Sequence, residues 1–162
     1  MAVGNIPKKG TKKSAKTARK KATGFTDEEK SAMQQRVTEL QTAARRGARG
    51  EGPNPEAELL EKIASMKAPD RALGRRIHDI VKASAPTLSP KLWYGMPAYA
   101  RAGKIVCFFQ PADKFKTRYA TFGFNDPAHL DEGHVWPIAF AITELSAADE
   151  AKIASIVKKA VS

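Results

Sequence analysis

Residues 91–110 read KLWYGMPAYARAGKIVCFFQ, and this stretch indicates which fold class the chain adopts. Aromatic and β-branched side chains favour the half-buried surface of a sheet. Gly103, inside the turn Arg101–Lys104, supplies the backbone conformation that a tight hairpin needs. The pattern therefore predicts two antiparallel strands, at about 91–99 and 104–110. Pro97 has no N–H to donate, which predicts an edge strand or a bulge at that point.

The aromatic residues extend this sheet toward the C-terminus. Eleven of the twelve lie between Trp93 and Phe140, and they predict further strands at about 117–124 and 135–142. Helical spacing of apolar residues precedes the sheet at 55–66 and 70–85 and follows it at 147–161. Helices first, then consecutive strands, then a helix predict an α+β fold, with an antiparallel four- to five-stranded sheet and helices packed on it.

An extra helix is predicted at 26–46, ahead of that domain. Thr26 with Glu29 three residues later forms a capping-box pattern, and Gly47 is a plausible end. Residues 47–53 are rich in Gly and Pro and form a linker. The helix either docks on the core or stays semi-independent. Its single apolar stripe consists of Met33, Val37, Leu40 and Ala44.

The positive charge of the chain is concentrated at the N-terminus. Residues 1–24 hold eight basic residues and no acid, so they carry +8 of the formal +11 and leave +3 for the rest. This segment has too few large apolar side chains for their burial to offset the conformational entropy lost on ordering. We therefore expect a disordered tail. The basic residues are Lys8, Lys9, Lys12, Lys13, Lys16, Arg19, Lys20 and Lys21.

A flexible polycation is a natural ligand for nucleic acid or another polyanion, because neutralising phosphates releases condensed counterions. The alternative is a solubilising leader without a dedicated partner. The expected organisation is thus a Lys-rich tail at 1–24, a helix with a Gly/Pro linker at 25–53, and an α+β domain at 54–162.

At Trp93-Tyr94-Gly95-Met96-Pro97-Ala98-Tyr99 the chain resembles the YdhG-like family, small domains of unknown function that are described as frataxin-like or as iron chaperones. The family's order of two helices, a Tyr-Gly-Met-Pro-Ala strand, a Gly-Lys hairpin, aromatic strands and a final helix matches residues 55–162. Gly103-Lys104 takes the hairpin position. The resemblance implies a two-layer α/β sandwich and a protein that handles iron; it does not cover residues 1–53.

One candidate site is a metal centre between the last two predicted strands. Three carboxylates and two imidazoles fall within nine residues: Asp126, His129, Asp131, Glu132 and His134. Imidazole and carboxylate together suit Fe(II) or Zn(II). The alternative is that these acids are helix caps and solvated turn residues.

A second candidate is a concave aromatic face that would take a small anionic ligand. Apolar walls with a few polar tips are typical of ligand pockets, and two cations among them would favour an anion. The alternative is that helices 55–66 and 70–85 cover this face, which makes the aromatic residues core. The pocket would be lined by Tyr94, Met96, Tyr99, Phe108, Lys116, Arg118 and Phe122.

The sequence gives little support to a catalytic or a membrane-spanning protein. The common motifs for nucleophile elbows, phosphate loops, dinucleotides and zinc proteases are missing, so we expect a binding protein and not an enzyme. Cys107, the single cysteine, lies in an apolar strand, where a thiol is usually inert. The longest apolar runs are five residues, too short for a membrane helix. We expect a cytoplasmic location.

Overall fold

The computed structural model describes residues 24–49 and 52–162, and within them the chain has the predicted α+β fold with five strands and five helices. The strands form one antiparallel sheet in sequence order, β1-β2-β3-β4-β5. They are β1 Ser89–Trp93, β2 Met96–Arg101, β3 Lys104–Gln110, β4 Ala120–Phe124 and β5 Ala139–Ile142. The helices are α1 Asp27–Arg49, α2 Pro55–Ala64, α3 Asp70–Ser84, α4 Ala112–Phe115 and α5 Ala147–Val161.

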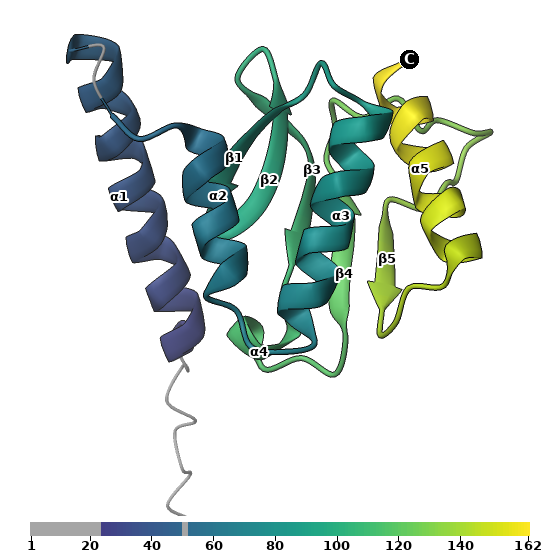
Figure 1. Ribbon diagram of the computed structural model, residues 1–162, viewed down its shortest axis with the longest axis horizontal. Helices are drawn as coiled ribbons and strands as arrows, with labels where there is room; N and C mark the ends of the chain where they lie inside the picture. The colour runs from purple at the N-terminus through teal and green to yellow at the C-terminus, as the bar shows by residue number, and fades with distance from the viewer. Residues whose placement is uncertain (1–23, 50–51) are drawn as a thin grey trace, which may run out of the picture.

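The domain has two layers, with α2, α3 and α5 side by side on one face of the sheet (Figure 1). The core lies between these layers, and its largest fully buried side chains are Tyr99, Phe109 and Phe122. Helix α1 stands outside this sandwich, beside α2 and near the β1 edge of the sheet (Figure 1). The side of α1 that faces α2 and β1 therefore forms an interface with the domain.

The predicted strand at 91–99 is wrong in one respect, because it is two strands joined by a hairpin. Tyr94 and Gly95 have φ angles of 53° and 71°. Two successive residues with positive φ form the tight turn that matches the twist of an antiparallel pair. The chain therefore reverses at Tyr94-Gly95, and Trp93 pairs with Met96.

Pro97 does not mark a sheet edge, since β2 lies between β1 and β3. Pro97 pairs with Leu92 of β1, whereas the pairing of β2 with β3 begins one residue later, at Ala98. Its missing N–H is thus tolerated near the start of the strand. A register shift does occur in β2, between Tyr99 and Ala100.

The starts of α1, α2 and α5 have the side-chain caps that their local sequences favour. The Asn54 side chain caps α2, and the capping boxes of Ser146 with Asp149 and of Thr26 with Glu29 are both formed. Gly47 does not end α1, which continues to Arg49. A glycine inside a helix costs only about 1 kcal/mol, so it weakens the helix without terminating it.

Candidate functional site

Helix α1 packs on the domain through its polar side and leaves its apolar stripe in solvent. Among the described residues of α1, only Ala32 has a buried side chain. Met33, Val37 and Leu40 are 39%, 54% and 53% exposed. The contacts of α1 with the domain are hydrogen bonds and ion pairs, because the surface beneath it offers backbone N–H groups and charged side chains.

The central contact is a carboxylate held by two backbone donors. The N–H of Tyr94 donates to Oε2 of Glu39 over 3.0 Å, and the N–H of Gly95 donates to Oε1 over 2.6 Å. The left-handed turn aims both N–H groups at the same point. We call this pair of donors the Tyr94–Gly95 clamp. Glu39 is only 14% exposed, so its charge relies on these partners.

Cations surround the clamp. Nη1 of Arg36 lies 3.3 Å from Oε2 of Glu39, and its guanidinium is 5.7 Å from the centre of the Tyr94 ring. Nζ of Lys114 donates to the Gln35 side chain of α1. Burial lowers the pKa of Lys114, and nearby Lys62 lowers it further, whereas Glu39 raises it. The clamp is therefore a site where negative charge is favoured.

Gly95 suits this turn because its positive φ strains most residues that carry a side chain. A Cβ at this position would meet the end of the Gln35 side chain of α1, which is flexible and would have to shift. The backbone conformation is therefore the reason for glycine here.

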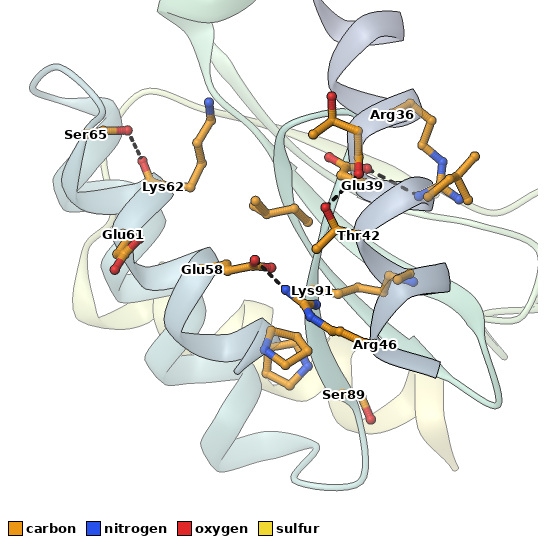
Figure 2. A pocket seen from close by; sticks show the side chains of 16 residues that line it. Arg36, Glu39, Thr42, Arg46, Glu58, Glu61, Lys62, Ser65, Ser89 and Lys91 are labelled. Carbon is orange, nitrogen blue, oxygen red and sulfur yellow. Dashed lines mark hydrogen bonds and ion pairs between the residues drawn. The ribbon is translucent and has the colours of Figure 1, made fainter. Parts of the chain in front are cut away.

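A cleft of about 630 Å³ opens beside the clamp, between α1, α2 and β1. Figure 2 shows that an ion pair between Arg46 of α1 and Glu58 of α2 crosses it. Lys62 and Lys91 also line the cleft, and neither makes an ion pair with another described residue. Glu61 is the acidic lining residue without such a pair. The cleft thus offers two lysines in addition to the clamp.

The predicted aromatic pocket is wrong as a single site. Tyr99 and Phe122 are 0% exposed and lie in the core beneath the helices. Tyr99 and Phe122 are therefore core residues, as the alternative to the pocket predicted, because α2 and α3 cover that face of the sheet (Figure 1). Lys116 and Arg118 are exposed beyond α4, and Arg118 lies over the Tyr119 ring.

The other three predicted pocket residues gather around Trp93. Its ring lies 5.2 Å from Tyr94 and 5.3 Å from Phe108, centre to centre, and Met96 is its strand partner. Strand alternation places Trp93, Met96 and Phe108 on the face opposite to the helices. Because residues 91–99 were predicted to form a single strand, the prediction did not divide the aromatic residues between the two faces of the sheet.

The five predicted metal ligands do not converge. No group of three His, Cys, Asp or Glu side chains in residues 24–49 and 52–162 is arranged to hold a metal ion. All five are exposed. Nδ1 of His129 lies 2.8 Å from the carbonyl of Ser162, and Glu132 pairs with Lys159. These side chains instead tie the loop to the end of α5 or face solvent.

The eight basic residues proposed to bind polyanions, from Lys8 to Lys21, lie outside the described residues. Within the described part of the chain, none of the helices is long and hydrophobic enough to span a membrane.

Sequence reasoning missed a buried polar chain in the core. His78, on α3, is only 4% exposed. Its Nδ1 lies 3.2 Å from the Tyr99 hydroxyl, and its Nε2 lies 3.2 Å from Oε1 of Glu56. In a neutral imidazole whose Nε2–H donates to the carboxylate, Nδ1 accepts from the Tyr99 hydroxyl.

Sequence reasoning also missed the role of Glu39. In the sequence, Glu39 is one polar residue among many on α1. Only the fold brings it next to Tyr94, which lies 55 residues later in the chain. The available signal was Gly95, since glycine suits a hairpin turn whose N–H groups are free to bind.

Comparisons of the chain with models of protein families, with curated proteins and with solved structures found no match.

Proposed function

We propose that this protein binds small carboxylate-bearing ligands in the cleft between α1 and the domain. The Tyr94–Gly95 clamp is the observation that carries the proposal, since it already holds a carboxylate with two converging donors. Glu39 then acts as an internal ligand, which an external carboxylate displaces from the clamp. Small carboxylates fit this chemistry because hydrogen bonds to an ionised group are stronger than neutral ones.

The cleft supplies the remaining recognition. Lys62 and Lys91 lie on its α2 and β1 walls and would face the outer part of a ligand that carries a second negative charge. The volume of about 630 Å³ falls within the range of small-molecule sites. A dicarboxylate is thus the ligand class that matches both the clamp and the lysines.

The test replaces the internal ligand. The variant Glu39→Ala should bind glutarate roughly tenfold more tightly than the unaltered protein, because the clamp no longer has a competing carboxylate. Titration followed by the amide resonances of Tyr94 and Gly95 would measure this. Glutarate should also raise the melting temperature of Glu39→Ala more than that of the unaltered protein.

Glu61→Ala is the matched control. It removes one negative charge from the same cleft and leaves the clamp occupied by Glu39. If Glu61→Ala gains affinity as much as Glu39→Ala does, the effect is general electrostatics and the clamp is not the site. If neither amide resonance moves with glutarate in any of the three proteins, the proposed function is wrong.

We further propose that the chain belongs to the YdhG-like family. The residues that carry the resemblance, Tyr94 to Ala98, form the turn of the clamp and the start of β2. Ligand binding at this hairpin would give that motif a function. The described residues offer no three-ligand cluster for iron, so iron handling draws no support from them.

A second candidate function rests on the charge of residues 1–24, which carry +8 of the formal +11. We propose that this segment gives the protein an affinity for nucleic acid or another polyanion. Such binding is independent of the clamp, since the two regions use different charges.

We expect the full chain to retard duplex DNA in a low-salt gel shift, and a chain lacking residues 1–24 to leave it free. If all eight basic residues engage phosphates, the log–log dependence of affinity on salt should have a slope of about −7. A full-length variant with the eight residues replaced by glutamine is the control for chain length. DNA that migrates freely with the full chain would exclude this function.

A further inference from the structure

The exposed stripe of α1 has the spacing of a coiled-coil seam. Met33, Val37, Leu40 and Ala44 are separated by four, three and four residues, the pattern of alternating a and d positions in a heptad. All four are exposed. Apolar residues sustained on one line of a helix mark an interaction surface, whereas isolated exposed ones do not.

The domain does not use this stripe. The contacts of α1 with the domain come from Ala32, Gln35, Glu39 and Arg46, which lie on the opposite side of the helix. The apolar stripe is thus left for a partner outside this domain. Val37 and Leu40, near its middle, are both more than half exposed.

The stripe is complementary to itself when a second copy runs antiparallel. A two-fold axis midway between Val37 and Leu40 places Val37 against Leu40 of the other copy. The same axis places Met33 against Ala44, so a large residue meets a small one. These are the a-to-d layers of an antiparallel helix pair, and a two-fold axis closes the assembly as a dimer.

Charge also selects the antiparallel direction. The first turn of α1 is acidic, with Asp27, Glu28 and Glu29, whereas the exposed Arg45 lies near its other end. An antiparallel pair brings the acidic end of each helix to the basic end of the other and opposes the helix dipoles. A parallel pair would place the three acids of one copy beside those of the other.

We propose that the exposed stripe of α1 is a homodimer interface, in which α1 of one copy packs antiparallel on α1 of a second. The seam from Met33 to Ala44 is only about 16 Å long. Such a small interface predicts a weak dimer, with a dissociation constant on the order of 100 µM. Leu40 also lines the cleft beside the clamp, but dimer formation does not depend on the proposed ligand.

The first test measures mass against concentration by sedimentation equilibrium of the full chain up to about 1 mM. The double variant Val37→Asp/Leu40→Asp should raise the dissociation constant roughly 100-fold, because two charges per copy enter the apolar seam. Both residues are exposed, so the fold should survive, which circular dichroism would verify.

The matched control is Ser31→Asp/Thr38→Asp, which adds the same charge to exposed α1 positions off the stripe. It should change the dissociation constant less than about threefold. A wild-type chain that stays monomeric at about 1 mM overturns the proposal. So does a dimer that Val37→Asp/Leu40→Asp leaves intact, which would place the interface elsewhere.

The second test determines direction with a short bis-maleimide cross-linker. Met33→Cys chains mixed with Ala44→Cys chains should cross-link to one another, while Met33→Cys alone should not, because its two copies are about 16 Å apart along the seam. Cys107 is fully buried in β3 and does not compete. Efficient self-linking of Met33→Cys would show a parallel pair and refute the antiparallel dimer.

A segment of the same chain, residues 1–23, is the competing occupant. If it covered the stripe, Val37→Asp/Leu40→Asp would shift the amide resonances of residues 1–23 without changing the mass. That result would overturn the dimer.

Discussion

Replacing Phe122 with alanine should lower the free energy of unfolding by about 3–5 kcal/mol, the usual cost of deleting a buried aromatic ring. Phe122 is 0% exposed and packs edge-on against Phe124, with ring centres 5.0 Å apart. Urea denaturation followed by circular dichroism would measure the loss. A residue that lined an open pocket would cost far less, so this variant also tests the assignment of Phe122 to the core.

Tyr119→Ala is the control for that prediction. Tyr119 is an aromatic residue just before the same strand, but it is 36% exposed and its ring contacts Arg118. Its removal should cost less than about 1 kcal/mol. Equal losses for Phe122→Ala and Tyr119→Ala would contradict the core described here.

The second large effect is expected at His78. His78→Ala should cost about 2–4 kcal/mol, because it opens a cavity and leaves the buried Tyr99 hydroxyl without its partner. Tyr99 is 0% exposed, so water cannot readily replace the imidazole. The Tyr99 hydroxyl would then be a buried donor without an acceptor, which is among the costlier defects in a core.

His78 also predicts how stability depends on pH. Burial lowers the pKa of His78 below its ordinary value of 6.5, although Glu56 partly opposes the shift. Below pH 6.5 the unfolded chain therefore binds a proton that the folded chain still excludes. The free energy of unfolding should fall as the pH drops from 6.5 toward the folded pKa. Above pH 6.5 this group should have no effect.

Chemical denaturation between pH 5 and pH 8 would measure the slope. His78→Ala should flatten it near pH 6, whereas His134→Ala, which removes an exposed histidine from the loop before β5, should not. An unchanged slope in His78→Ala would show that other groups cause the dependence.

Features that depend on neighbouring residues were predictable from the sequence. The caps at Thr26, Asn54 and Ser146 involve hydrogen bonds that span two or three residues, so their side chains identify them directly. The order of helices and strands follows from hydrophobic spacing in the same way. The Tyr94-Gly95 turn was not predicted, because the aromatic residues on both sides favour a strand more strongly than one glycine favours a turn.

The candidate site depends on contacts between distant parts of the chain, and no local pattern encodes them. Glu39 meets Tyr94 across 55 residues, and His78 meets Tyr99 across 21. The apolar stripe of α1 was visible in the sequence, but its spacing is equally compatible with packing on the domain or with facing outward.

The order of residues alone was enough to determine helices, strands and the α+β class, because backbone hydrogen bonding and side-chain period are set within a few residues. Which side of α1 faces the domain, and which aromatic residues are core, was decided by the assembled fold. Burial and electrostatic pairing are properties of surfaces that exist only after distant segments have packed together.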